Sequence, residues 1–568
     1  MPRIAVAGND RFDALPAASA SSAAPPVAAG AHTDSMANAR NLLILRHYTV
    51  SLLAAIALCA CKDPPAPPPP IAAVVAPPAA PVDLAALEKT AGRHWTLDRR
   101  AAAIAEGKAT LHKHQCTRCH TLDGQPSHGR PNDCVKCHTF LLDLPNQPKR
   151  YHDIANRHGE AIVQRYLRNI EHLLQVPDLS RLGARVRPDW IGRYVREPFD
   201  LRPHASESMI RTALTEAEAR QIARYFAAVA DVPDPAAPEN APEPPPAKPS
   251  AARLAQGKAL FATKACATCH VFGNVVFDQK PATPLRGKPS PNDLAPNLRF
   301  VRDRMAPSAV VAWLLNPQSV QADAKMPRLG LTQAEAETLR DWLFHADPEL
   351  QPQPPPAPPQ LPPAVARPVG WAEVKERVLG KVCVHCHMND HENDTGPGNG
   401  GGLGYPGLGL SFRTYERAVF GARDKQGTRH SVFEILPGET LPRILASMLQ
   451  RRAEHQRDNL PPGRDWERPP FPPGPLGMPM GLPAMTDEEL GLLRAWIEQG
   501  CPGPTEVTGK PGFNDGFLVP DGPIAVNQGC QLRAPTDPPP AWSYEASRRH
   551  AADPHAVTPT GAHTPTGH

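Results

Sequence analysis

The sequence is poor in aromatic residues, in net charge and in long apolar runs. Its 61 basic and 57 acidic residues leave a formal net charge of only +4, which gives no electrostatic footprint for nucleic acid. The apolar run TVSLLAAIALCA (49–60) is too short to span a bilayer as a helix. Aromatic residues make up 5% of the chain, which is thin for domains that build cores from side chains alone. A large apolar cofactor inside each domain would relieve that shortage.

Proline is abundant instead, with 72 residues, and it is concentrated in the runs 63–81, 231–249 and 347–368. Such runs favour extended polyproline II and cannot form a packed core, so we interpret them as semi-rigid spacers. A chain of 568 residues is expected to hold three or four domains. The predicted boundaries are a non-native start plus lipoprotein signal peptide at 1–61, Pro-rich linkers at 62–82, 231–250 and 348–368, folded units at 83–230, 251–347 and 369–505, and an irregular C-terminal tail at 506–568.

The segment from Met36 to Cys61 has a modestly basic start followed by the short apolar run, as an export signal does. Its end, Leu58-Cys59-Ala60-Cys61, resembles a bacterial lipobox in which Cys61 carries the lipid, with an ordinary signal peptide as the alternative. Residues 1–35 have no secretory character, so we expect Met36 to be the true start. The predicted location is the periplasm or the cell surface, with a membrane anchor on Cys61.

The 12 cysteines fall into three groups. Cys59 and Cys61 belong to the export signal, whereas Cys501 and Cys530 are a candidate disulfide in an oxidising compartment. The other eight form four CxxCH pentads, too many to arise by chance in a chain with 23 histidines. The pentads are Cys116-Thr-Arg-Cys119-His120, Cys134-Val-Lys-Cys137-His138, Cys266-Ala-Thr-Cys269-His270 and Cys383-Val-His-Cys386-His387.

A CxxCH pentad is the attachment signal of c-type haem. Cysteines three positions apart lie on one face of a helical turn and match the two vinyl groups on one side of the haem. The histidine that follows points at the iron as its proximal ligand. The cysteines of 116–137 also have a spacing close to that of a four-thiolate zinc site. Because zinc explains neither 266–270 nor 383–387, we expect four covalent haem c groups.

Three threonines, Thr215, Thr332 and Thr486, define an internal repeat. Each precedes a glutamate by three residues, which makes a capping box, and apolar residues at offsets 7, 10 and 11 form one amphipathic stripe. A methionine lies six residues before each threonine, and a thioether is a suitable soft distal ligand for haem iron. The candidate distal ligands are Met209, Met326 and Met480, with Met478 as the alternative in the third unit.

All three units resemble class I-type cytochrome c domains, over about 104–230, 253–346 and 371–500. The resemblance is carried by CxxCH, by a P-[DN]-L segment in the first two units and by the methionine before the terminal helix. It implies an all-α fold of three small helical domains, in which the helix bearing CxxCH crosses the C-terminal helix. The third unit carries a glycine-rich stretch, 396–427, instead of the P-[DN]-L segment and is similar to the cytochrome c-like domains common in planctomycetes.

The first unit is predicted to hold two haems, but the repeat supplies only Met209, which the register assigns to the haem at Cys116–His120. The haem at Cys134–His138 then needs another distal ligand or keeps an open site. His152 and His158 are favoured because the second unit has no segment that corresponds to theirs. The other nearby candidates are His112, His114, His128 and His172.

Four haems on tethered, exported units predict an electron-transfer protein rather than an enzyme. The expected partners are other redox proteins, such as a quinol-oxidising complex, a terminal reductase or a soluble cytochrome. One alternative is a haem enzyme whose iron keeps an open position for a small substrate such as peroxide, although the sequence offers no further catalytic constellation. Another alternative is a non-redox scaffold in a surface complex.

Overall fold

The computed structural model describes residues 82–127, 133–205, 207–237, 243–279, 290–350, 357–388, 402–424, 426–459, 474–503 and 530. The chain divides into two compact units, Met1–Val75 and Ala76–His568, and every described residue belongs to the second. The predicted export signal, with Met36 and Cys61, lies outside the described residues, as do His128 and the side chain of His158.

Helices dominate the described part of the chain, in agreement with the predicted all-α class. Its two strands, β1 (Ala422–Arg423) and β2 (Arg429–His430), pair antiparallel in the third unit. No helix in these ranges has both the length and the apolar character that a membrane crossing requires.

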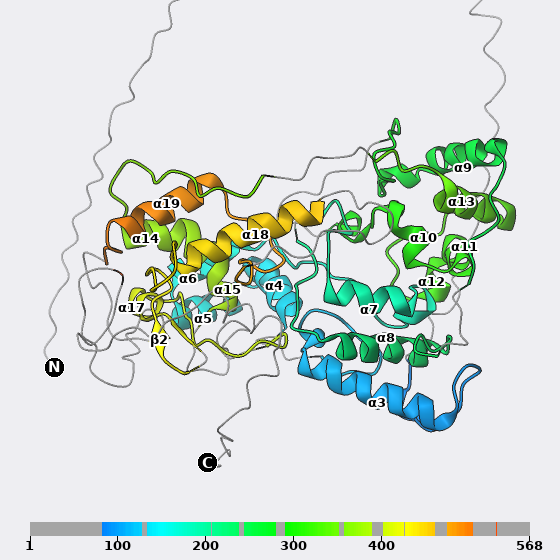
Figure 1. Ribbon diagram of the computed structural model, residues 1–568, viewed down its shortest axis with the longest axis horizontal. Coiled ribbons are helices and arrows are strands. Elements are labelled where there is room, and N and C mark those ends of the chain that lie inside the picture. The colour runs from blue at the N-terminus through cyan, green and yellow to red at the C-terminus, as the bar shows by residue number, and fades with distance from the viewer. Residues whose placement is uncertain are drawn as a thin grey trace, which may run out of the picture. The chain divides into compact units, whose positions relative to one another are not determined.

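Figure 1 labels the larger helices and strand β2; in the text η marks 3-10 helices, except that η8 is a π-helix. The first unit contains α2 (Leu84–Leu87), α3 (Leu97–Lys113), η1 (Cys116–Arg118), α4 (Cys134–Asp143), η3 (Leu144–Asn146), α5 (Pro148–His158), α6 (Glu160–Asn169), η4 (Leu182–Ala184), α7 (Pro188–Arg196) and α8 (Glu216–Ala230). The second contains α9 (Ala251–Thr263), η5 (Cys266–Thr268), η6 (Pro291–Leu294), η7 (Leu298–Phe300), α10 (Val301–Arg304), α11 (Pro307–Leu315), α12 (Pro317–Val320) and α13 (Gln333–His345). The third contains α14 (Trp371–Val374), η8 (Lys375–Cys383), α15 (Val384–Cys386), α17 (Tyr415–Phe420), α18 (Arg443–Asn459) and α19 (Asp487–Glu498).

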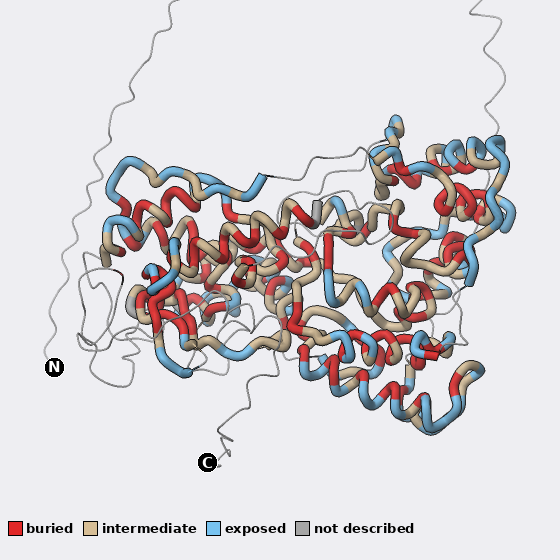
Figure 2. The backbone as a smooth tube through the Cα atoms, in the orientation of Figure 1, coloured by how far each residue is buried: buried red, intermediate tan, exposed pale blue. Residues whose placement is uncertain are grey.

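The three predicted capping boxes form, one at the start of each terminal helix. At α8, the Thr215 hydroxyl accepts a hydrogen bond from the Glu218 amide at 3.2 Å, and the Glu218 carboxylate accepts one from the Thr215 amide at 2.9 Å. The apolar stripe that follows each threonine faces a core, which confirms the predicted register (Figure 2). Its most buried members are Ile222, Tyr225, Phe226, Leu339, Trp342, Leu343, Leu493 and Trp496.

In the first two units, the helix before the pentad crosses the terminal helix at a glycine (Figure 1). A Cβ atom on Gly107 of α3 would stand 2.3 Å from the Cβ atom of Tyr225 of α8. A Cβ atom on Gly257 of α9 would stand 2.3 Å from that of Trp342 of α13. Only a residue without a side chain allows the two helices to approach this closely.

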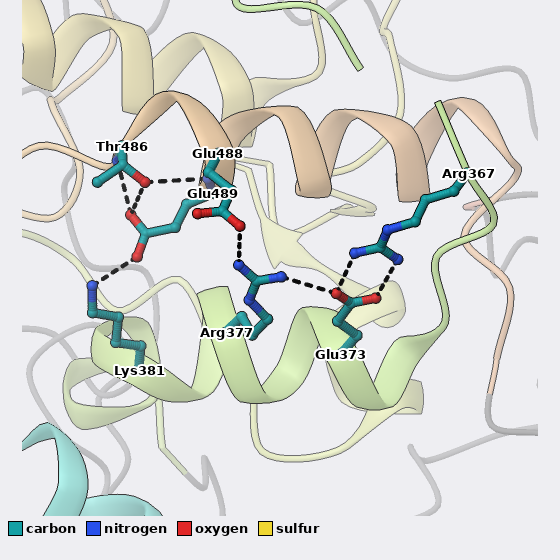
Figure 3. Close-up of polar contacts among 7 residues, drawn as sticks. All are labelled: Arg367, Glu373, Arg377, Lys381, Thr486, Glu488 and Glu489. Atoms are coloured by element: carbon teal, nitrogen blue, oxygen red, sulfur yellow. Dashed lines mark hydrogen bonds and ion pairs between the residues drawn. The ribbon is translucent and has the colours of Figure 1, made fainter. Parts of the chain in front are cut away.

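The third unit joins its helices differently, through aromatic rings and charges. The ring centroids of Trp371 of α14 and Trp496 of α19 lie 5.7 Å apart. At the other end of α19, Arg377 of η8 pairs with Glu488, and the same arginine lies 3.1 Å from Glu373 (Figure 3).

One ion pair recurs in all three units. It joins a lysine two or three residues before the pentad to the glutamate of the capping box, and so ties the two helices together beside the cysteines. The pairs are Lys113–Glu218 at 2.6 Å, Lys264–Glu335 at 3.0 Å and Lys381–Glu489 at 2.7 Å.

The first unit contacts both of the others within Ala76–His568. Arg165 of α6 pairs with Glu376 of η8 at 2.9 Å. The Ser208 amide donates to the Gly481 carbonyl at 2.7 Å. Phe300 of η7, in the second unit, belongs to the buried core of the first unit. The units are therefore joined by packing as well as by the linkers.

Described residues of the predicted linkers also contact folded units. The Pro246 carbonyl accepts a hydrogen bond from His345 at 2.8 Å, and the Pro362 carbonyl accepts one from Arg494 at 2.9 Å. Val365 packs against the core of the third unit. These residues of the predicted semi-rigid spacers are therefore held against the folded units.

Cys501 and Cys530 form a disulfide, as predicted, with their Cα atoms 5.0 Å apart. Both cysteines are buried in the core of the third unit, which also contains Trp496. Cys530, the one described residue of the predicted tail at 506–568, therefore belongs to this core.

Candidate haem-attachment sites

Two pentad histidines are held by the P-[DN]-L segments. Nδ1 of His120 lies 2.9 Å from the Pro177 carbonyl oxygen, and Nδ1 of His270 lies 2.9 Å from that of Pro296. A carbonyl only accepts hydrogen bonds, so Nδ1 carries the proton in both rings. The lone pair is then on Nε2, the nitrogen available to a metal, and the ring is oriented as in other metal-ligating histidines.

The other two pentad histidines make the same kind of bond with different partners. Nδ1 of His387 lies 3.3 Å from the Leu410 carbonyl oxygen, and Nδ1 of His138 donates to the carbonyl of His172. All four rings therefore have the tautomer that leaves Nε2 as the ligating nitrogen. Burial lowers the pKa of His120, His138 and His270, which favours the neutral, metal-binding form.

The local backbone explains why the first two units place their cysteines alike. Helix α3 ends shortly before Gln115, and α9 ends shortly before Ala265. These two residues adopt the left-handed backbone conformation, with φ of 50° and 58°. A 3-10 turn with the first cysteine then follows, at Cys116 and at Cys266. The cysteines at 134–137 differ because they begin α4, whose amide groups Asp133 caps.

Cysteines of the first two pentads are in contact, and a cysteine of the fourth pentad lies within electrostatic range of them. The Cys119 thiol is hydrogen-bonded to the Cys134 thiol, and the Cys386 thiol is near enough to interact with both. The contact with Cys134, together with burial, raises the pKa of Cys119, whereas the same contact lowers that of Cys134. Sequence spacing predicts that the first two pentads are neighbours, but not that the fourth joins them.

The candidate distal methionines are partly buried. The Trp313 indole donates to the sulfur of Met326 at 3.0 Å, which fixes this thioether in the second unit. Met209 and Met480 line one pocket, whose walls also include Arg211 and Glu454. The Met478 amide donates to the Ser447 carbonyl at 2.9 Å. The assignment of each methionine to an iron stays a prediction.

Of the two favoured candidates for the second haem of the first unit, the side chain of His158 lies outside the described residues, and His152 is not brought to His138 in the described contacts. His152 is exposed on α5, beside Tyr151. His172 supplies its carbonyl to His138, while its ring lies between Glu171 and Glu207, 3.6 and 3.8 Å away.

His385 of the third unit is the residue that reaches His138. Its ring centroid lies 5.6 Å from that of His138. In the sequence, this histidine stands at a variable position inside the fourth pentad, Cys-Val-His-Cys-His. This extra histidine is the only sign in the sequence that the fourth pentad could supply a further ligand. The spacing of the sequence does not show that it lies beside His138.

No group of three or more His, Cys, Asp or Glu side chains that could hold a metal ion is found among the described residues. All four cysteines of 116–137 lie in this part of the chain. Comparison of the chain with protein-family models, with curated proteins and with solved structures found no match.

Proposed function

We propose that this protein is an exported tetrahaem c-type cytochrome that relays electrons between redox partners. The observation that carries the proposal is the common state of the four pentad histidines. Each follows a CxxC pair, and each donates its Nδ1 proton to a backbone carbonyl, which leaves Nε2 for iron. Four independent histidines with the same tautomer are difficult to explain without a common ligand.

These residues fit haem c, which when bound supplies a one-electron iron centre. The paired cysteines would hold each group covalently, and the pentad histidine would be its proximal ligand. The attachment residues are Cys116, Cys119 and His120; Cys134, Cys137 and His138; Cys266, Cys269 and His270; and Cys383, Cys386 and His387. The proposed distal ligands are Met209, Met326 and Met480, with Met478 as the alternative to Met480.

The packing of the units supports a relay. Cys119 contacts Cys134, and Cys386 of a different unit lies within electrostatic range of both, so three attachment points are near one another. The second unit contacts the first near its own candidate ligand, because Arg185 stacks over the Trp313 ring that binds Met326, 5.7 Å from its centroid. The chain would thus keep the centres close and sheltered from water.

The family proposed is that of multihaem cytochromes built from class I-like domains, with a third domain of the planctomycete type. The location proposed is the periplasm or the cell surface, with a lipid on Cys61. The partners proposed are redox proteins, such as a quinol-oxidising complex, a terminal reductase or a soluble cytochrome.

The proposal is tested by counting haems in protein matured in an exporting host. Haem-to-protein ratio and intact mass should both give four covalent haems. Replacing the two cysteines of any one pentad with serine should remove one haem, whereas the matched pair Cys501→Ser and Cys530→Ser should keep all four. A colourless mature protein, or a metal that chelators remove, contradicts the proposal.

A further inference from the structure

The ring of His385 is held against that of His138 by residues of the first unit. His385 stacks on Tyr166 of α6, with ring centroids 4.8 Å apart and planes inclined by 20°. On another side it meets His138, with centroids 5.6 Å apart and planes inclined by 84°. Helix α6 is fastened to this part of the third unit through Arg165 and Glu376, so the approach of the two histidines belongs to a larger interface.

The Nε2 atom of His385 is buried and has no hydrogen-bond partner in the described part of the chain. A buried polar atom without a partner is costly, so an unpaired imidazole nitrogen at this place needs an explanation. His138 uses its Nδ1 for the His172 carbonyl, and therefore also presents an unprotonated Nε2. Two imidazoles at one place thus each have a nitrogen suited to iron.

The separation of the rings also suits a shared metal ion. With metal–imidazole bonds of about 2 Å, one ion between two imidazoles places their ring centroids about 6 Å apart. The observed 5.6 Å is close to that value. The steep angle between the planes is compatible with this arrangement, because each axial ring can turn about its own metal–nitrogen bond.

Other described histidines fit this role less well. His172 lies on the proximal side, since its carbonyl binds His138, and carboxylates face both of its ring nitrogens. The Nε2 atom of His114 lies 3.4 Å from Glu218, where the end of α3 meets the start of α8. His152 is exposed.

We propose that His385, from the third unit, is the distal axial ligand of the haem attached at Cys134–His138 in the first unit. This inference rests on the proposed function. The second haem of the first unit is then bis-histidine ligated, and its ligand set is completed across the contact between two units. Bis-histidine ligation lowers the reduction potential relative to His/Met ligation, so this haem has the lowest reduction potential of the four.

The test is His385→Ala in the full, matured protein, with ferric electron paramagnetic resonance and ferrous carbon monoxide binding as readouts. One haem of the four should change from low-spin to high-spin, and the reduced variant should bind one more equivalent of carbon monoxide than the wild type. Added imidazole should restore the low-spin signal. His385→Met should keep that haem low-spin and raise its potential.

Two backgrounds locate the haem that changes. In a Cys134→Ser, Cys137→Ser protein, His385→Ala should add no high-spin signal. In a Cys383→Ser, Cys386→Ser protein, which loses the neighbouring haem but keeps His385, the second haem should stay low-spin. This second variant also separates ligation from any failure of His385→Ala to attach haem at 383–387. His152→Ala is the matched control and should match the wild type.

The outcomes separate this inference from the proposed function. Fewer than four haems in the wild type contradict the proposed function. Four haems in the wild type, together with an unchanged spin state and unchanged carbon monoxide binding in His385→Ala, contradict the role of His385 alone. Lower stability without a spectroscopic change would show that His385 is only a packing residue.

Discussion

The first two units and the third bring the pentad helix and the terminal helix together by different means. In the first two, a glycine lies directly on an aromatic residue, Gly107 on Tyr225 and Gly257 on Trp342. In the third, Trp496 packs on another tryptophan, and charged side chains at the start of α19 make the remaining contacts (Figure 3). The start of the terminal helix is the same in all three, because the capping box and its lysine partner recur in each unit.

The comparison separates the residues that define the terminal helix itself from the residues that define how that helix packs on another. The capping box sets where the terminal helix begins, and the apolar stripe sets which face is buried. The residue at the crossing sets how closely the helices approach. A glycine allows backbone contact, whereas a large ring holds the helices apart and fills the space between them. The same repeat therefore supports two packing solutions.

The largest expected effect is the loss of an aromatic ring at the crossing. Trp496 is fully buried between Trp371 and Phe433, so Trp496→Ala should reduce the free energy of unfolding by about 3–5 kcal/mol. Denaturant unfolding followed by circular dichroism measures this loss. Val276→Ala, at a side chain that is 78% exposed, is the control and should stay within about 0.5 kcal/mol of the wild type. An equal, small effect of both substitutions would show that the third unit does not depend on this ring.

The next effect distinguishes the glycine crossings. Gly257→Ala forces a Cβ atom against Trp342 and should cost about 1–3 kcal/mol in the second unit. Gly107→Ala should cost a similar amount in the first. Hydrogen exchange on peptides of α13 and α8 would assign each loss to its own unit.

Gly370 supplies the matched control in the third unit. It is exposed, and no heavy atom lies within 4 Å of a Cβ atom built on it. Because Gly370 is the N-cap residue of α14, Gly370→Ala should cost only the difference between these two residues at an N-cap, about 0.5–1 kcal/mol, without any steric clash. If Gly257→Ala were as mild as this control, the helices would not depend on close approach.

Much of this arrangement could be predicted from the sequence because it is encoded locally. Thr215 and Glu218 are three residues apart, and the stripe of the helix that follows repeats with the period of a helix, so both are visible without a structure. Cys501 and Cys530 remain as a pair once the export signal and the pentads account for the other cysteines. The two glycines at the crossings stand at the same distance before Cys116 and Cys266, but a glycine inside a helical pattern has many possible reasons, so the sequence does not give their contacts.

The parts that could not be predicted depend on contacts between distant segments. His138 and His385 meet only because α6 packs against η8, and no periodic pattern links residues so far apart. The same applies to Cys386 beside Cys119, since the two belong to different repeats. The repeated spacing within each unit predicts the ligands that the unit supplies to its own haem. It cannot predict a ligand that comes from a neighbouring unit.

The smallest expected effect concerns two carboxylates of the third unit: Glu489, which belongs to the capping box shared by all units, and Glu373, which belongs to the additional charges of this unit. Burial raises the pKa of Glu489, but hydrogen bonds from Lys381 and Thr486 outweigh it and lower the pKa below the usual value. The hydrogen bond from Arg367 is the main reason that the pKa of Glu373 falls to about 2. Because both values are lower in the folded state, these carboxylates stabilise the fold fully above the usual glutamate pKa and lose that contribution as the pH falls through the folded values.

The substitution Glu489→Gln should therefore cost about 0.2–1 kcal/mol near neutral pH and less in acid or in high salt. Unfolding measured by denaturant between about pH 7 and about pH 3 tests this, with the difference between variant and wild type as the quantity compared. Glu335→Gln in the second unit is the matched variant, because Glu335 occupies the same capping position and pairs with Lys264. The two differences should shrink together on acidification, while Glu373→Gln should reduce acid sensitivity in the third unit alone. The wild type and Glu373→Gln could instead lose stability equally on acidification. That result would show that the additional charges do not hold the helices of the third unit together, as the glycine crossings do in the first two units.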